Sequence, residues 1–156
     1  MSIQVISVNR KAYHDYHVLE TLEVGVALVG TEVKSLRKGD ANLRDAYARI
    51  ENGEVWLHNA HIARYDAGNR YNHDPLRPRK LLIHRKEIDE LARRLHEGGT
   101  TLIPLRLYFK DSHRVKLEIG LVRGKKQYDK REAIAKRDVE REMARAVRRD
   151  PITSRQ

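Results

Sequence analysis

The segment "TTLIPLRLYFKDSHRVKLEIGLV", residues 100–122, decides the fold class because it predicts two long strands joined by a short turn. Apolar side chains alternate with polar ones on both sides of the "KDSH" sequence, and this period of two is typical of strands that bury one face. The apolar positions are Leu105, Leu107 and Phe109 before the turn, and Val115, Leu117, Ile119 and Leu121 after it. The segment therefore predicts an antiparallel pair.

Two further segments upstream predict strands. In "DAYARIENGEVWLHNAHI", residues 45–62, alternating residues surround Asn52-Gly53, which is the strongest short signal for a two-residue hairpin turn. "YHVLETLEVGVALVG", residues 16–30, is rich in β-branched residues and predicts a long strand that bends at Gly25. The chain is therefore expected to be mainly antiparallel β.

Short helices are expected between the strands. "TEVKSLRKGD", residues 31–40, predicts a short helix that Gly39 ends, and "LLIHRKEIDELARRLHEGG", residues 81–99, has helical apolar spacing. The Gly-, Asn- and Pro-containing residues 65–80 predict a loop. Twisted antiparallel strands with inserted helices favour an α+β fold built on a closed antiparallel barrel of the oligonucleotide/oligosaccharide-binding (OB) type.

The C-terminal segment differs from the rest. From Gly124 onward good helix formers predominate, but the apolar stripe of Ala135, Val139 and Met143 is thin. Such small residues bury too little surface to offset the ordering of a long segment. We expect an OB-type RNA-binding domain over residues 1–123 and a basic tail over residues 124–156, disordered alone and helical on a partner.

Charge and composition narrow the function. The 156 residues contain 32 Lys and Arg against 22 Asp and Glu, a formal net charge of +10, which attracts polyanions such as nucleic acid. An anionic membrane surface usually requires a basic helix with bulky apolar residues, and the basic tail has neither Trp nor Phe. Without cysteine, a membrane-length apolar run or a secretion signal, a cytoplasmic protein is expected.

The residues that could carry chemistry do not form a recognised motif. "GLVRGKK", residues 120–126, lacks the glycine spacing and the hydroxyl residue of a phosphate-binding P-loop. His58 and His61 lie on a predicted strand, where their spacing places them on opposite faces. The acids Glu23, Glu32, Asp45 and Asp74 show no catalytic spacing. We expect no catalytic residues, no metal and no cofactor.

The basic side chains are better candidates for function because they cluster. The clusters are Lys34, Arg37 and Lys38 in the first predicted helix, Arg77, Arg79 and Lys80 beside the loop, and Arg123, Lys125 and Lys126 after the last strand. On a small barrel such residues can follow a phosphate backbone, and nearby tyrosines can stack on unpaired bases. Three solvated patches on different faces remain the alternative.

Several long segments carry a family resemblance. They are "NRKAYHDY" at 9–16, "GVALVGTEVKSLRKGDANLRDAY" at 25–47, "LHNAHIARY" at 57–65, "HDPLRPRKLLIHRKEI" at 73–88 and "VRGKKQYDKR" at 122–131. Together they resemble the small protein B (SmpB) family, the SsrA-binding proteins of bacterial trans-translation. The resemblance implies an OB-type barrel in the cytoplasm with no enzymatic activity. It further implies binding to the tRNA-like part of transfer-messenger RNA, which the protein delivers to stalled ribosomes.

The resemblance also implies roles for particular residues. Glu23 and Leu82 match RNA-binding positions of the barrel, and His84 stands where the family often has Asn. The positions expected to contact phosphates are Lys34, Arg37, Arg79, Lys80, Lys125 and Lys126. The tail residues Tyr128, Asp129, Lys130 and Arg131 match the part expected to reach the small-subunit decoding centre, the tail folding as a helix in the empty messenger channel.

Two other functions stay open on the residues alone. A general single-strand RNA-binding OB module would share the basic patches and the tyrosines. An RNA-cleaving enzyme would need acids that converge only after folding. We expect the protein to be a monomer.

Overall fold

The computed structural model describes residues 2–65 and 72–125. The chain divides into two units, Met1–Arg123 and Gly124–Gln156. Of the second unit only Gly124 and Lys125 lie within the described residues, so the predicted fold of the tail is outside them. No helix among the described residues has the length and apolar character needed to cross a membrane.

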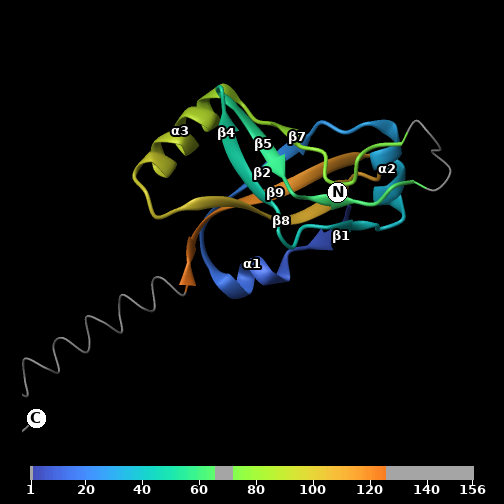
Figure 1. The fold of residues 1–156 in the computed structure, drawn as a ribbon, viewed down its shortest axis with the longest axis horizontal. Helices are drawn as coiled ribbons and strands as arrows, with labels where there is room; N and C mark the ends of the chain where they lie inside the picture. The colour runs from blue at the N-terminus through green and yellow to red at the C-terminus, as the bar shows by residue number, and fades with distance from the viewer. Residues whose placement is uncertain (1, 66–71, 126–156) are drawn as a thin grey trace, which may run out of the picture. The chain divides into compact units, whose positions relative to one another are not determined.

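The first unit consists mainly of antiparallel strands with three short helices among its described residues (Figure 1). The strands are β1 (Ile3–Val8), β2 (Tyr16–Val26), β3 (Ala41–Asn42), β4 (Tyr47–Glu51), β5 (Glu54–His58), β6 (His61–Ile62), β7 (Arg79–Leu82), β8 (Thr101–Lys110) and β9 (Arg114–Gly124). The helices are α1 (Arg10–Asp15), α2 (Gly30–Arg37) and α3 (Arg85–His96). Figure 1 shows α2 and α3 near opposite ends of the strands.

Seven strands form one sheet in the order β1-β8-β4-β5-β7-β2-β9, and β9 also pairs with β8. A separate two-stranded sheet joins β3 and β6. The predicted mainly β, antiparallel class is confirmed.

The β8–β9 hairpin forms where the alternating pattern predicts it. Its register runs from Lys110 opposite Arg114 to Thr101 opposite Val122, with a shift between Pro104 and Arg106. Proline has no backbone N–H, so the ladder cannot continue regularly past Pro104. Gly120 leaves room for the Leu105 side chain, because a Cβ there would lie 2.8 Å from a methyl group of Leu105.

The β4–β5 hairpin also agrees with the prediction. Asn52 and Gly53 have φ values of 52° and 77°, the left-handed conformation that a two-residue hairpin turn requires. Val55 and Leu57 point into the core, so Glu54, Trp56 and His58 point outward.

Three elements differ from the expectation. The four-residue strand β7 occupies the end of the predicted loop and the start of the predicted helix, and α3 begins only at Arg85. β7 pairs with β5 on one side and β2 on the other, so its conformation depends on partners distant in sequence. β1 and α1 were not predicted. Asn9 caps α1 by accepting from the Ala12 N–H at 3.1 Å.

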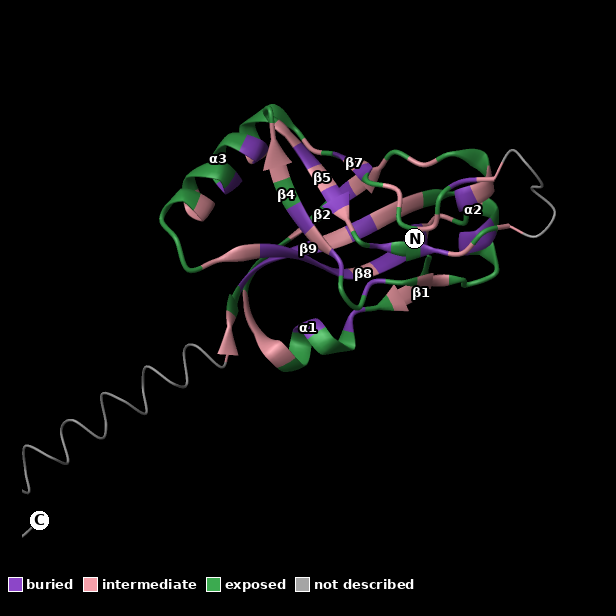
Figure 2. Cartoon of the chain, viewed as in Figure 1, coloured by how far each residue is buried: buried purple, intermediate pink, exposed green. Residues whose placement is uncertain are grey.

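The core lies between the strands and under α3. Its buried side chains include Leu81 of β7, Leu102 and Leu107 of β8, and Leu117, Ile119 and Leu121 of β9. Leu105 of β8 belongs to a second, smaller cluster with Ala12, Ile103 and Val122. Figure 2 shows the buried segments along these strands and the exposed side of α3 facing away from them. Ile88 and Leu91 of α3 are buried at the helical spacing that the sequence indicates.

Candidate RNA-binding surface

The β2–β7 pairing brings three of the predicted site residues to one face. Gly25 lies opposite Leu82, while the alternating neighbours Val24 and Leu81 are buried. Glu23 is two residues before Gly25, so it shares the outer face with Leu82. His84 follows Leu82 by two residues with an extended backbone. We call Glu23, Leu82 and His84 the outer patch.

Leu82 is the apolar member of the outer patch, and it is exposed. Its side chain is 55% exposed, although large apolar residues are usually covered. A groove of about 400 Å³ runs beside it, and its lining includes Lys80, Leu82, His84 and Arg85. The structure therefore joins an apolar contact surface to basic side chains, the combination that bases and phosphates require together.

The carboxylate of Glu23 is held by two side chains of β8. The Tyr108 hydroxyl donates to Glu23 Oε2, and Lys110 Nζ donates to Glu23 Oε1 at 3.0 Å. The Tyr108 hydrogen bond and then the Lys110 hydrogen bond lower the pKa of Glu23 below its ordinary value. The pKa of Tyr108 is raised by burial and by its bond to the carboxylate. Glu23 is therefore an ionised acceptor at neutral pH.

Lys80 is accessible but already has an acidic partner. Its Nζ lies 2.5 Å from Glu54 Oε2, and both side chains are more than two-fifths exposed, at 44% and 42%. An exposed pair of this kind is weak, so a phosphate can replace Glu54. The prediction of a phosphate contact at Lys80 is compatible with this position.

A row that the sequence analysis missed crosses three neighbouring strands. Arg49 lies opposite Trp56, and Trp56 lies opposite Lys80. Trp56 points outward and is half-buried, so it shares the outer face of the sheet with Arg49 and Lys80. Outward positions in the alternating pattern of residues 45–62 could have revealed Trp56, but only the register places it beside Lys80.

Lys34 and Arg37 of α2 form a separate basic group. Lys34 Nζ lies 5.5 Å from the centre of the Tyr65 ring, and the Arg37 guanidinium lies 5.0 Å from the centre of the Phe109 ring. Since α2 and α3 lie near opposite ends of the strands, these cations are not beside His84 at the start of α3 (Figure 1). The α2 cations thus lie apart from His84, whereas Arg77 of the loop cluster reaches α2 through its bond to Glu32 Oε1 at 2.6 Å.

Arg79 is not available to a phosphate, and this prediction is corrected. Its side chain is 0% exposed, and its guanidinium donates to Glu32 Oε2 at 2.5 Å and to the Ala60 carbonyl at 2.7 Å. A third bond reaches the Pro75 carbonyl at 3.2 Å. Each of the three guanidinium nitrogens donates to the protein and the side chain is enclosed, so Arg79 stabilises the fold and is closed to a phosphate in this structure.

Glu32 organises this buried network, which we call the Glu32 clasp and which comprises Glu32, Arg77 and Arg79. Arg77 Nη2 donates to Glu32 Oε1 at 2.6 Å, and the Val29 N–H donates to the same oxygen at 2.9 Å. Burial by itself raises the pKa of Glu32, but the bonds from Arg77, Val29 and Arg79 outweigh it and the pKa is lowered. Glu32 is therefore a structural acid.

The remaining predicted site residues lie at or after residue 125, the last residue that the structure describes. Lys125 is half-buried just after β9. Lys126, Tyr128, Asp129, Lys130 and Arg131 fall outside the described residues, so their predicted contacts stay predictions.

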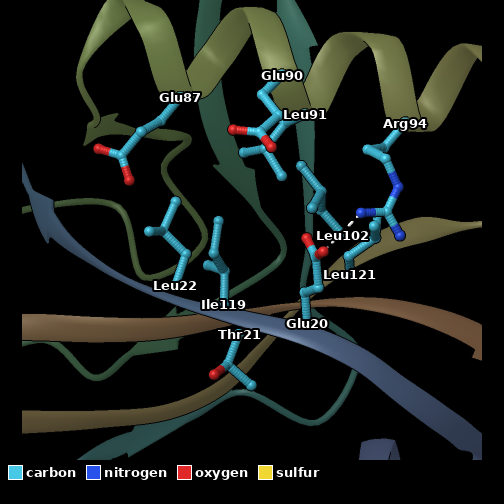
Figure 3. A pocket seen from close by; sticks show the side chains of 10 residues that line it. All are labelled: Glu20, Thr21, Leu22, Glu87, Glu90, Leu91, Arg94, Leu102, Ile119 and Leu121. Atoms are coloured by element: carbon cyan, nitrogen blue, oxygen red, sulfur yellow. Dashed lines mark hydrogen bonds and ion pairs between the residues drawn. The ribbon is translucent and has the colours of Figure 1, made fainter.

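A second cavity has the wrong charge for RNA. It measures about 100 Å³ and lies between α3 and the strands, with Leu22, Leu91 and Ile119 among its apolar lining (Figure 3). Glu87 and Glu90 border it from α3, and Glu20 binds Arg94 at 2.6 Å. The three acids outnumber Arg94, which is already paired with Glu20, so the charge of this cavity does not attract phosphates.

The described residues hold no cluster of metal-ligating side chains. Within residues 2–65 and 72–125 no three or more His, Asp or Glu side chains gather as metal ligands. Of the acids considered from sequence, Glu32 is bound within the clasp and Asp45 pairs with Lys11 at 3.1 Å.

Comparison with known proteins supports the sequence resemblance. The model of the SmpB protein family matches residues 6–149. The SsrA-binding protein of Carboxydothermus hydrogenoformans is 60% identical over 145 residues, which are 93% of this chain and 97% of that protein. The SsrA-binding protein of Moorella thermoacetica is 57% identical over 146 residues, 94% of each chain. A chain of the solved structure "tmRNA-SmpB: a journey to the center of the bacterial ribosome" is 48% identical with a TM-score of 0.65, covering 76% of this chain and 82% of that one.

Proposed function

This chain belongs to the SmpB protein family, and from that membership we propose that it binds transfer-messenger RNA and acts with it on stalled ribosomes in trans-translation. Its role is that of an RNA-binding adaptor, not of an enzyme. Since its partners are the RNA and the ribosome, it works in the cytoplasm, and one copy suffices for one RNA.

The proposed scaffold is a closed barrel of the OB type. The pairing of β9 with β8, added to the order β8-β4-β5-β7-β2-β9, supports closure because each of these strands then has two neighbours within the ring, with β1 added outside it on β8. Closure removes free strand edges and gives a rigid outer surface on which RNA contacts can be placed.

The outer patch is the proposed contact for the tRNA-like part of transfer-messenger RNA. The observation that carries this proposal is the β2–β7 register, which aligns Gly25 with Leu82 and so puts Glu23 on the face of Leu82. Leu82 offers an apolar surface for a base or ribose, and Glu23 offers an acceptor for base N–H or ribose O–H groups. Lys80 supplies phosphate attraction beside them.

The tail, residues 124–156, is proposed to enter the empty messenger channel and fold there as a helix. Tyr128, Asp129, Lys130 and Arg131 would contact the decoding centre, with Tyr128 stacking on a base. The basic composition of the tail supports this assignment because ribosomal RNA lines such a channel with phosphates.

The test separates RNA binding from the ribosomal step. Full-length protein is titrated with the tRNA-like RNA and with a random oligonucleotide, and peptide tagging is measured on stalled ribosomes. We expect the tRNA-like RNA to win the competition, and we expect affinity to fall steeply with salt. Equal affinity for the two RNAs would favour a general single-strand RNA-binding module instead.

A triple variant tests the division of labour. Asp129→Ala, Lys130→Ala and Arg131→Ala together should abolish tagging while leaving affinity for transfer-messenger RNA within about twofold, since the patch on the strands is untouched. An equal loss of binding and tagging would contradict the separate role of the tail.

A further inference from the structure

Within the outer patch, the Glu23 carboxylate is held by hydrogen bonds from a different strand, β8. Among the described residues, neither of the other two members of the patch has such bonds to its side chain. Tyr108 and Lys110 stand two residues apart on β8, so they point to the same side of the sheet. Each of them donates to a different oxygen of the Glu23 carboxylate. We propose that Tyr108 and Lys110 are positioning residues for RNA recognition, fixing the Glu23 carboxylate in the orientation that accepts hydrogen bonds from RNA.

Positioning matters because a glutamate at the surface is flexible. Ordering such a side chain on binding costs rotamer freedom. Here the side chain is already ordered before RNA arrives, although it is still 37% exposed. Each carboxylate oxygen can accept more than one hydrogen bond, so acceptor capacity remains for RNA after Tyr108 and Lys110 are bound.

Tyr108 is well suited to hold Glu23 without contacting RNA itself. Its side chain is 1% exposed, and the Arg106 guanidinium lies 4.9 Å from the centre of its ring. β1 and β9 flank it, since Val5 and Lys116 are its partners in the two ladders. The ring is therefore fixed, and its hydroxyl is bound to Glu23.

The charged surroundings of Glu23 come from two neighbouring elements. From β8 they are Tyr108 and Lys110, and from β9 Lys116 adds a favourable charge without a hydrogen bond. Arg106 and Glu118 act on the Tyr108 hydroxyl with opposite signs. By alternation His84 faces the same side as Glu23.

Removing the Tyr108 hydroxyl should therefore change how RNA affinity depends on pH. The Tyr108 bond is the largest cause that lowers the pKa of Glu23. Without it the carboxylate protonates at a higher pH as the solution is acidified, and a protonated carboxyl accepts less well. The acid limb of RNA binding should move to higher pH in Tyr108→Phe than in the wild-type protein.

A double-mutant cycle provides the direct test. The inference rests on the proposed role of Glu23, so Glu23→Ala is measured first, with full-length protein and the tRNA-like part of transfer-messenger RNA. We expect Glu23→Ala to weaken binding about tenfold, the lower end for a hydrogen bond to a charged group. Tyr108→Phe should weaken it about three- to tenfold, because the carboxylate stays and only its positioning is lost. In the Glu23→Ala background Tyr108→Phe should have no further effect.

Lys110 has a matched control on the neighbouring strand. Lys110→Met and Lys116→Met each remove one positive charge from the surroundings of Glu23, but only Lys110 donates to the carboxylate. Lys110→Met should weaken RNA binding about threefold more than Lys116→Met, and this excess should vanish with Glu23→Ala. If Tyr108→Phe lowers the melting temperature so far that binding cannot be measured, the cycle of Lys110→Met and Glu23→Ala tests the positioning inference instead.

Each of the other outcomes would contradict either the positioning inference alone or the proposed role of Glu23 as well. If Glu23→Ala weakens binding but Tyr108→Phe and Lys110→Met do not, the positioning inference is wrong while the proposed function stands. If Tyr108→Phe weakens binding equally with and without Glu23, the hydroxyl acts independently of Glu23, and the inference is again wrong. If Glu23→Ala binds RNA as wild type does, the proposed role of Glu23 fails and the inference fails with it.

Discussion

Glu23 and Glu32 are nine positions apart in sequence, and each is an ionised carboxylate held by two side chains, but they serve different ends. Glu32 is 0% exposed and is enclosed by Arg77, Arg79 and the Val29 N–H. Glu23 is 37% exposed and is held from one side by Tyr108 and Lys110. The comparison teaches that hydrogen bonding alone does not single out a candidate RNA-binding acid, and that the accessibility of its remaining acceptor sites must be considered as well.

Breaking the Glu32 clasp should have the largest effect on stability. Arg79→Met leaves the buried Glu32 carboxylate without one of its two arginine partners, and removing one partner of a buried pair costs about 3–5 kcal/mol. Urea denaturation should show this loss in the free energy of unfolding. Lys80→Met, one position along the same strand but exposed, is the control and should change stability by less than about 1 kcal/mol. A similar small change in Arg79→Met would contradict the clasp.

Acid should remove the contribution of Glu32 in a defined direction. The folded-state pKa of Glu32 lies below its unfolded value of about 4.3, so the stabilisation is fully present above that value and is lost as pH falls through the folded pKa. The stability difference between wild type and Glu32→Gln should therefore be largest near neutral pH and shrink below about pH 4. Denaturation curves measured at a series of pH values would show it. A difference that stays constant down to pH 2 would mean that the charge of Glu32 does not matter.

Crowding the outer patch should have a moderate effect that falls mainly on RNA binding. A Cβ added at Gly25 would lie 3.2 Å from Leu82 Cβ and 3.3 Å from Leu82 Cδ1. Gly25→Ala should displace the Leu82 side chain, lowering stability by about 1 kcal/mol and RNA affinity about threefold. Gly30→Ala is the matched control because nothing lies within 4 Å of its added Cβ. Unchanged affinity in Gly25→Ala would argue that Leu82 does not contact RNA.

The smallest effect is expected at the exposed pair of Lys80 and Glu54. Here the substitution should raise RNA affinity instead of lowering it. Glu54→Gln removes an acid from the groove and frees Lys80, so affinity should rise about twofold while stability changes by less than about 1 kcal/mol. Fluorescence titration at low salt would resolve the gain. A loss of affinity would show that Glu54 itself contacts RNA.

The sequence predicts the parts of the fold that depend on neighbours along the chain. Alternation and the Asn52-Gly53 turn are local signals, and both predicted hairpins form. The buried positions of α3, Ile88 and Leu91, also follow from local spacing. Strand β7 was missed because four residues carry too short a pattern, and its conformation is imposed by β2 and β5.

The candidate site also depends on contacts between residues distant in sequence, which local patterns do not predict. Family resemblance indicated Glu23 and Leu82, but their shared face depends on the β2–β7 register, which no local pattern fixes. Arg79 was taken for a phosphate contact because a basic residue beside a loop is usually exposed, whereas its acidic partner Glu32 lies 47 positions earlier in sequence. Tyr108 and Lys110 had a usable signal, since both alternate with the apolar residues of β8.

The lysines of α2 and the Tyr65 ring have one more consequence. Lys34 and Lys38 each extend to the face of this ring, at 5.5 Å and 4.9 Å from its centre. Cation–π attraction restricts side chains that would otherwise sample many rotamers in water. These ammonium groups therefore form a preorganised pair. A polyanion that binds at α2 would lose less side-chain entropy, because both lysines are already ordered before it arrives.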